Sequence, residues 1–211
     1  SFADAIPRQP YETINLQYLN EKSQPDFSLA DFVASNFEIP APIELDEHHQ
    51  VNDLTGYISS MWQVLEKQPD KRQAGSLLPL NHAYIVPGGR FREIYYWDSY
   101  FTALGLAQAG KLKLIENTIN NFIELQNEIG CIPNGNRAYY HSRSQPPVLA
   151  LLVSLYQQHV DIDDQTLVKF VAGIEKEYQF WMDGEFDLSP TQHTHRRLVM
   201  MPDGGFLNRY W

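Results

Sequence analysis

The residues best suited to chemistry lie in the stretch 87–100, which reads Pro-Gly-Gly-Arg-Phe-Arg-Glu-Ile-Tyr-Tyr-Trp-Asp-Ser-Tyr. The paired glycines, Gly88 and Gly89, permit a positive φ or a close approach to another molecule. Beside them, the Arg90 guanidinium offers fixed hydrogen-bond donors, the Asp98 carboxylate accepts from hydroxyl groups, and Trp97 supplies a flat apolar ring. This combination suits a ligand with many hydroxyl groups, such as a sugar whose C–H face stacks on the indole.

A second polar stretch, 132–147, reads Ile-Pro-Asn-Gly-Asn-Arg-Ala-Tyr-Tyr-His-Ser-Arg-Ser-Gln-Pro-Pro. Asn134, Arg143 and Gln145 carry amide and guanidinium groups of the kind that bind hydroxyls. Taken alone, Asn-Gly-Asn is more often a simple turn, since Asn and Gly readily adopt positive φ. The two stretches would form one site only if the fold brings them together.

Apolar residues at helical spacing predict the elements that hold these stretches. Five helices are expected: from Val51 to the break at Gln68-Pro69, from about Asp98 to Gly110, from Leu112 to Gly130, from Pro147 to about His159, and from the acidic turn 161–164 to about Met182. Asp98 is the expected N-cap of the second helix and Pro147 the expected first residue of the fourth. No segment shows the alternation of a strand, so the expected fold class is all-α.

The lengths of the connections predict where the polar residues gather. Consecutive helices in an antiparallel assembly alternate in direction. The short connections at Gly110 and 160–163 therefore fall at one end, and the long ones, 67–97, 130–146 and 183–211, fall at the other. Arg90, Trp97, Asp98 and the polar residues of 132–147 should meet at that second end. Residues 1–50, with five prolines, are expected to form an extended arm that wraps the helices, containing one short helix at 28–33 capped by Ser28.

Composition excludes several classes of protein. The chain has 211 residues, 43% of them hydrophobic, and a formal charge of −10, which argues against a nucleic acid or anionic membrane as partner. No apolar run reaches the length of a bilayer span, so a soluble protein is expected. The start lacks the pattern of a signal peptide, although one could have been removed. The single cysteine, Cys131, is expected to be a packing residue.

Four short motifs suggest other sites but lack the required partners. The adjacent histidines of 44–49 do not share a helix face, so a solvated turn is expected there. His193 and His195 have no third ligand at a suitable spacing, so no metal site is expected. The acidic turn 161–164 lacks the glycine and the final carboxylate of a calcium loop, and helix capping explains it better. Gly88-Gly89-Arg90 lacks the Gly-Lys-Ser/Thr end of a phosphate-binding loop. No cofactor is expected.

The string Pro-Gly-Gly-Arg-Phe-x-Glu-x-Tyr-x-Trp-Asp-x-Tyr at 87–100 resembles the first signature of the α,α-trehalases, a glycoside hydrolase family. The stretch 132–147, Phe-Ala-Asp-Ala-Ile-Pro-Arg at 2–8 and Leu-Asn-Arg-Tyr-Trp at 207–211 are also similar to trehalases. The resemblance implies part of an (α/α)₆ barrel with long active-site loops at one end, and hydrolysis of α,α-trehalose to two glucose molecules with inversion. It implies substrate-binding roles for seven residues, which are Arg90, Trp97, Asp98, Asn134, Arg143, Ser144 and Gln145.

The resemblance also implies that the catalytic acid and base are absent. The family's acidic Asp and basic Glu lie in motifs that would follow Trp211, and an (α/α)₆ barrel needs about twelve helices. Residues 51–211 are therefore expected to be the N-terminal part of one catalytic domain, with the missing C-terminal portion and trehalose or glucose as partners. The chain alone is expected to be inactive and to leave inner-face residues such as Leu149, Leu152, Phe170 and Trp181 without full packing.

Two alternative functions stay open on the sequence. The chain could be a non-catalytic sugar-binding or helical fragment, or belong to an (α/α)₆ glycosidase that acts on another glucoside. If the isolated chain proved active, Glu93 with Asp98 would be the carboxylate pair to consider. The sequence does not separate a periplasmic or secreted location from a cytoplasmic one.

Overall fold

A computed structural model of the protein describes residues 2–41, 53–72, 74–88 and 90–209. The described residues form seven α-helices, which are α1 (Tyr11–Glu21), α2 (Leu29–Asn36), α3 (Leu54–Leu65), α4 (Tyr96–Gln108), α5 (Leu112–Ile129), α6 (Leu149–Gln157) and α7 (Asp164–Trp181). The strands are short: β1 (Ile6–Pro7), β2 (Phe37–Glu38), β3 (Glu66–Lys67), β4 (Tyr84–Ile85), β5 (Thr194–His195), β6 (Leu198–Met200) and β7 (Phe206–Asn208). The predicted, mainly helical class is confirmed. None of the described helices has the length and apolar character needed to cross a bilayer.

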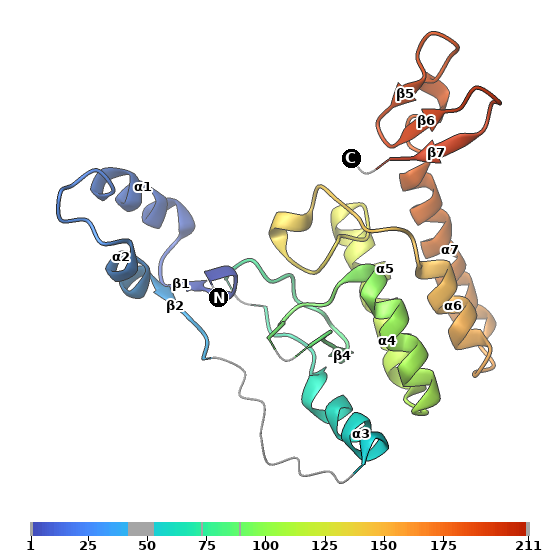
Figure 1. Cartoon of the computed structure of the whole chain (residues 1–211), viewed down its shortest axis with the longest axis horizontal. Coiled ribbons are helices and arrows are strands. Elements are labelled where there is room, and N and C mark those ends of the chain that lie inside the picture. The colour runs from blue at the N-terminus through green and yellow to red at the C-terminus, as the bar shows by residue number, and fades with distance from the viewer. Residues whose placement is uncertain (1, 42–52, 73, 89, 210–211) are drawn as a thin grey trace.

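Helices α4 to α7 form the main body and run alternately up and down (Figure 1). Their inner faces build one core, whose fully buried members include Leu106, Ile115, Ile119, Phe122, Leu149, Leu152 and Phe170. The expectation that Leu149, Leu152, Phe170 and Trp181 lack packing partners is wrong, because all four are buried within this chain. The apolar side chains left exposed lie on other faces, for example Phe101 on α4 and Val168 on α7.

The helix ends mostly follow the predicted signals. Gly110 and Gly130 both have positive φ, 68° and 90°, after α4 and α5. The Asp163 carboxylate accepts from the Thr166 amide at 2.9 Å and caps α7, so the acidic turn is a helix cap. Two starts differ from expectation. Helix α4 begins at Tyr96, which places Asp98 in its first turn rather than at its cap, and α6 begins at Leu149 rather than Pro147.

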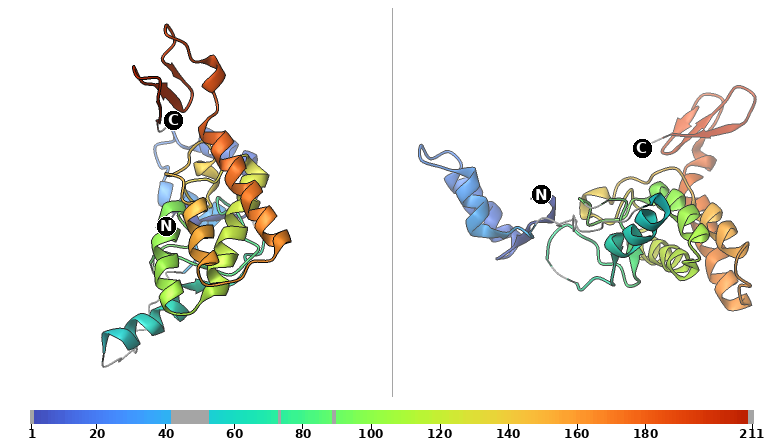
Figure 2. Two further views of the ribbon diagram at one scale, coloured as in Figure 1. Left: turned by 90° about the vertical axis from the view of Figure 1, so that its right-hand side faces the viewer. Right: turned by 60° about the horizontal axis from the view of Figure 1, so that its bottom comes forward.

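Two of the three long connections gather at one end of the helical body, as predicted. The third, 67–97, runs partly along the side of the body instead, where His82 and Ala83 bond to Asn121 and Asn117 of α5. In Figure 1 the segment 130–147, the start of α4 and the strands after α7 lie at the upper end, while the short turns after α4 and α6 lie at the lower end. The side view in Figure 2 agrees with this arrangement. Helix α3 lies beside the lower half of α4, where its Trp62 and Leu65 pack against the main core and the Trp62 ring faces Gly105.

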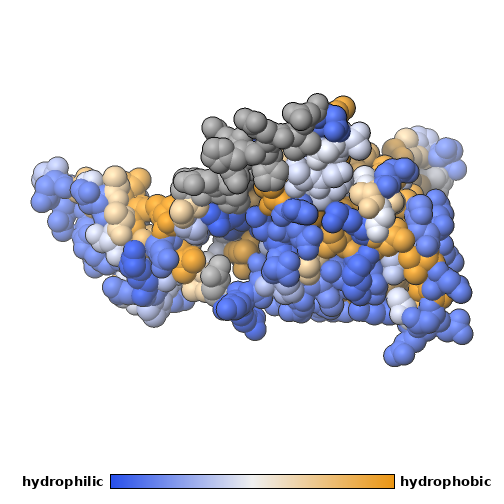
Figure 3. Space-filling view, turned by 90° about the horizontal axis from the view of Figure 1, so that it is seen from below, coloured by the Kyte–Doolittle hydropathy of each residue, from blue (hydrophilic) through white to orange (hydrophobic). Residues whose placement is uncertain are grey.

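The N-terminal residues differ from the predicted extended arm. Ser28 caps α2 as expected, since its hydroxyl accepts from the Asp31 amide at 3.3 Å, but residues 11–21 form a further helix, α1. Strands β1 and β2 pair antiparallel, and a small cluster of Ala5, Ile14, Phe32 and Phe37 packs between the elements. This N-terminal helical pair projects from the body in Figures 1 and 2, and Figure 3 shows apolar side chains on its surface. Residues 44–49, considered above for a metal, lie outside the described residues.

The tail beyond α7 is not irregular as expected. Strands β5, β6 and β7 form an antiparallel sheet in the order β5-β6-β7. The turn into this sheet requires Gly184, which has φ of 102° and whose hypothetical Cβ would lie 2.7 Å from Cδ2 of His195. The strands have only two or three residues each, too few for an alternating pattern to be visible in the sequence.

Candidate functional site

Two polar loops meet at the start of α4. Tyr95 pairs with Gly135 in an antiparallel bridge, and the Tyr96 amide donates to the Asn134 carbonyl at 3.0 Å. The Asn134 amide in turn donates to the Arg143 carbonyl at 3.0 Å. Gly135 is required by close approach rather than by a positive φ, because a Cβ there would lie 2.7 Å from the Ile94 carbonyl oxygen. The structure therefore brings the two predicted stretches together.

A side chain also joins the two loops. The amide oxygen Oε1 of Gln145 accepts from the Trp97 backbone N–H at 3.0 Å. This bond fixes the orientation of the amide and leaves its NH₂ group as the part that can donate to a ligand. Trp97 is 44% exposed, and its ring packs edge-on with the Phe101 ring at 6.4 Å, so part of this residue's surface is accessible to a ligand.

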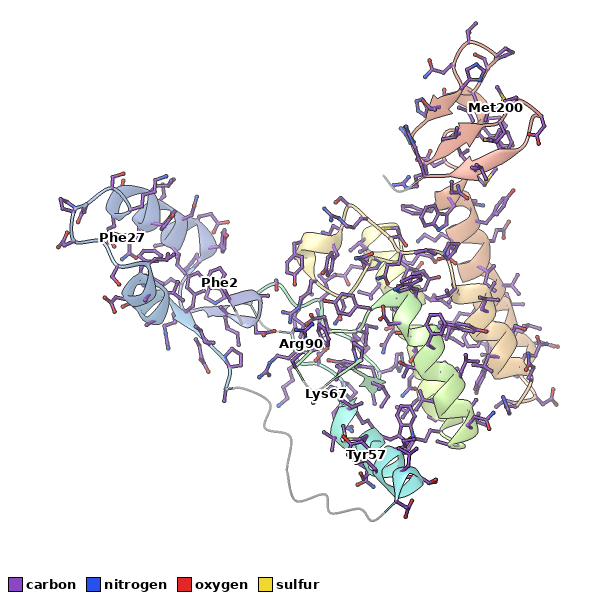
Figure 4. The ribbon with its side chains drawn as sticks, viewed as in Figure 1. Phe2, Phe27, Tyr57, Lys67, Arg90 and Met200 are labelled. Carbon is purple, nitrogen blue, oxygen red and sulfur yellow. The ribbon has the colours of Figure 1, made fainter. Side chains whose placement is uncertain are left out.

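The two arginines predicted for the site are exposed. Among the residues that the structure describes, none forms a hydrogen bond or ion pair with the Arg143 side chain, while its backbone amide donates to the Tyr140 carbonyl and its carbonyl accepts from Asn134. The Arg90 guanidinium lies over the Phe91 ring at 4.6 Å, on the loop that precedes α4 (Figure 4). Phe91 contacts Tyr95 edge-on, and Tyr95 contacts Tyr140 in the same way, so a row of rings connects the two loops. Both cations thus have donors ready for a hydroxylated ligand.

The other predicted residues occupy less open positions. Asp98 and Asn134 are half-buried, and Asp98 lies one residue beyond the stacking indole. Ser144 is buried, and its hydroxyl donates to the Gln145 carbonyl at 3.1 Å, which fits support of the loop better than contact with a ligand. Gly88 lacks the positive φ considered above, and a Cβ there would meet only ordinary contacts.

A buried ion cluster below the loops was missed by the sequence analysis. Arg137 is 2% exposed, and its Nε donates to Oε2 of Glu93 at 3.1 Å. Its Nη2 pairs with Glu93 and with Asp4, and its Nη1 donates to the Ser76 hydroxyl at 3.1 Å. Burial alone would lower the pKa of Arg137, but the bonds and charges of Glu93 and Asp4 outweigh burial and raise it. Glu93 is committed to this cluster and also accepts from the Tyr95 hydroxyl at 2.9 Å, so it is not a spare carboxylate.

Asn136 acts as a buried spacer between loops. Its Nδ2 donates to the Leu78 carbonyl and its Oδ1 accepts from the Ile94 amide, both at 2.8 Å. This fully buried side chain therefore connects the backbones of two segments, which lie 42 and 58 residues before it in sequence. It therefore contributes to the position of the segment before Tyr95 and Tyr96.

A second buried polar group lies below the start of α6. The Tyr96 hydroxyl accepts from the amides of Val148 and Leu149 at 2.9 and 2.7 Å and donates to the Glu177 carboxyl on α7. Burial raises the pKa of Glu177 to about 7, against the opposing effect of the bonds from Tyr96 and Leu149. Neither residue could be singled out from the sequence, because their partners lie 52 and 81 residues away.

Two of the cavities that border the N-terminal segment also reach the body of the protein. One of about 260 Å³ is lined by polar residues such as Asp70 and Arg92, and a larger, mostly apolar one of about 900 Å³ is lined by Phe2, Tyr11 and Tyr139 among others. Neither includes the seven predicted sugar-binding residues. Within the described ranges, no group of three or more His, Cys, Asp or Glu side chains is placed to hold a metal ion, and His195 lies 3.6 Å from Asp187.

Comparison with known proteins gives a consistent result. The family profile named Trehalase matches residues 6–211. The chain is 42% identical over 211 residues to a periplasmic trehalase of Pseudomonas aeruginosa, covering 100% of this chain and 38% of that protein. It is 43% identical over 212 residues to a periplasmic trehalase of Shigella flexneri, covering 100% of this chain and 37% of that protein. The neutral trehalase Nth1 of Saccharomyces cerevisiae aligns with a TM-score of 0.49 and 30% identity, over 68% of this chain and 28% of that one. The chain thus spans well under half the length of the curated relatives that it matches.

Proposed function

The chain belongs to the trehalase family, and from this we propose that it supplies the sugar-binding face of an enzyme that hydrolyses α,α-trehalose to glucose. The observation that carries the proposal is the bond between the Trp97 amide and Gln145, which holds an exposed indole beside the loop of Arg143. A flat ring for the C–H face of glucose and cationic donors for its hydroxyls are what binding of a neutral sugar requires.

Each of the seven residues has a role in this proposal. Trp97 stacks on a glucose ring, and Asp98 accepts from a pair of hydroxyls. Arg90, Arg143 and the NH₂ group of Gln145 donate to hydroxyl oxygens, as does Asn134, which can also accept. Ser144 supports the loop through its bond to the Gln145 carbonyl.

Inverting hydrolysis needs an acid that protonates the glycosidic oxygen and a base that activates water on the opposite face, about 6.5–9.5 Å apart. We assign neither role to the described residues. Glu93 is buried in the pair with Arg137, and Glu177 is buried beneath α6. Both catalytic carboxylates are proposed to come from the remaining length that the relatives possess. Residues 51–211 would then form the N-terminal part of one barrel domain, and residues 1–50 an arm that wraps it.

The test uses the full-length enzyme, in which these 211 residues are joined to a segment of the length that the relatives have. Glucose release is measured with trehalose, maltose and sucrose, together with calorimetric titration of the same sugars. We expect preference for trehalose in both measurements. Preference for maltose or sucrose would indicate a glycosidase for another glucoside, and binding without glucose release would indicate a non-catalytic sugar-binding protein.

We further propose a periplasmic location, which rests on the names of the relatives. Fractionation of cells that produce the protein at its natural level, followed by assay of trehalose hydrolysis, tests this. Activity confined to the cytoplasmic fraction would contradict the proposal.

A further inference from the structure

The Tyr96 hydroxyl lies at a junction of three helices. Tyr96 is on the first turn of α4, its oxygen accepts from two amides at the start of α6, and its proton goes to Glu177 on α7. Tyr96 is fully buried and Glu177 is 5% exposed, so their hydrogen bond is shielded from bulk solvent. Figure 1 shows the three helices side by side at the loop end of the body.

The hydroxyl takes the place of a missing helix cap. The first amides of a helix lack partners within it, and a side chain just before the helix usually accepts from them. Here the preceding residues are two prolines and Val148, and no side chain of the flanking sequence caps α6. Both lone pairs of the phenol oxygen are used by the amides of Val148 and Leu149, and its one proton by Glu177. Every capacity of the hydroxyl is therefore occupied.

Two consecutive residues of α4, Tyr96 and Trp97, hold the loop 143–147 at both of its ends. The Trp97 amide binds Gln145, and the Tyr96 hydroxyl binds the backbone at Val148 and Leu149. Between these anchors lie Pro146 and Pro147, whose fixed φ limits how far the loop can bend. A shift of α6 relative to α4 would therefore be transmitted to Gln145 and to Arg143, two residues before it.

We propose that Tyr96 and Glu177 are positioning residues for sugar binding, which hold the loop 143–147 in register with Trp97 and Asp98; this rests on the proposed function. Neither residue touches the sugar. They act through Gln145 and Arg143, whose donors are useful only if they lie at the correct distance from the stacking indole.

The charge of Glu177 adjusts how firmly the loop is held. A hydrogen bond to a carboxylate is about twice as strong as one to a neutral acid. The groups that face the carboxyl are the Tyr96 hydroxyl from α4 and the Leu149 amide from α6, and the Phe122 ring of α5 packs edge-on against Tyr96 at 4.9 Å. Burial places the pKa of Glu177 at about 7, so this bond is charge-assisted above neutral pH and weaker below it.

The test compares Tyr96→Phe with Tyr156→Phe in the full-length enzyme. Tyr156 makes the same kind of bond, from its hydroxyl to Glu116 at 3.1 Å, but at the opposite end of α6. We expect Tyr96→Phe to raise KM for trehalose about tenfold with a smaller change in kcat, and to accelerate hydrogen exchange at the amides of Val148 and Leu149. Tyr156→Phe should leave both measurements close to wild type. Equal KM values in the two variants, with unchanged exchange at Val148 and Leu149, would overturn the proposal.

A second variant covers the case in which Tyr96→Phe does not fold. Glu177→Gln keeps an acceptor for Tyr96 but removes the charge. We expect KM of the wild type to rise as pH falls through 7 and KM of Glu177→Gln to stay at the higher value throughout. A wild-type KM independent of pH, or a variant that retains the pH dependence, would contradict the positioning role. If the wild type does not cleave trehalose, the proposed function fails, while exchange at Val148 and Leu149 in the variants still tests the anchor itself.

Discussion

The buried pair between Arg137 and Glu93 gives the sharpest prediction about stability. The guanidinium group of Arg137 donates hydrogen bonds to Glu93, Asp4, Ser76 and a backbone carbonyl. The residue is 2% exposed. We expect Glu93→Gln to lower the free energy of unfolding by about 3 kcal/mol. Removing one partner of a buried ion pair typically costs about 3–5 kcal/mol, because the remaining charge is left without compensation. Gln keeps one acceptor oxygen and Asp4 stays in place, so the lower end of that range applies.

The assay is urea-induced unfolding followed by tryptophan fluorescence. With a slope of about 1–3 kcal/mol per molar urea, a loss of about 3 kcal/mol lowers the midpoint by at least about 1 M. Asp183→Asn is the matched control, because Asp183 also pairs with arginines, Arg196 at 2.6 Å and Arg197 at 3.4 Å, but its own side chain is 39% exposed. The two substitutions change the net charge equally. Exposed pairs contribute little, so the control should keep the wild-type midpoint.

The comparison between the two variants decides the prediction. If Glu93→Gln shifts the midpoint no more than Asp183→Asn, the guanidinium of Arg137 is compensated by something other than Glu93. The argument that this cluster anchors residues 3 and 4 to the loops would then fail. A large shift in both variants would instead show that net charge, rather than burial, controls stability.

Three further outcomes are expected. In the full-length enzyme, Arg143→Ala and Asp98→Ala should each remove bonds worth about 1.5–3 kcal/mol and lower kcat/KM for trehalose by up to about a hundredfold, whereas Arg72→Ala, at an exposed arginine outside the site, should not. Burial raises the pKa of Glu177 from 4.5 to about 7, so its contribution to stability is fully present below pH 4.5, and up to about 3 kcal/mol of the free energy of unfolding is lost as pH rises through 7. Urea unfolding at a series of pH values measures this loss. Glu177→Gln should abolish it. The 211-residue chain alone should release no glucose from trehalose, and measurable turnover would assign catalysis to carboxylates within it.

The helices and their order could be predicted because the signals for them are local. Spacing of apolar residues identifies a helix face within a few turns, and Gly110 and Gly130 mark helix ends through a positive φ that other residues avoid. The alternation of short and long connections then placed Trp97 and Arg143 at one end without knowledge of any contact. Helix α1 was missed because only Ile14 of its residues is buried, which leaves a weak pattern.

The internal supports of the site could not be predicted because their partners are distant in sequence. Arg137 binds Asp4 across 133 residues, and Tyr96 binds Glu177 across 81. Charged and hydroxyl side chains are usually exposed, so sequence patterns predict them at the surface. Their burial becomes favourable only when the fold supplies hydrogen-bond or ion-pair partners. Gly135 is a related case, since its turn-like neighbours conceal a close approach to the Ile94 carbonyl.

Glu177 links stability and site geometry in opposite directions. Burial makes its charged form unfavourable, so the fold is less stable above neutral pH, where the carboxylate is ionised. The same ionised carboxylate accepts most strongly from Tyr96 and so holds the start of α6 and the loop before it. Glu177→Gln should therefore be the more stable protein at pH 8 and the weaker sugar binder. The buried charge therefore lowers the stability of the fold while it fixes the geometry of the loop. Functional sites commonly reduce stability in this way.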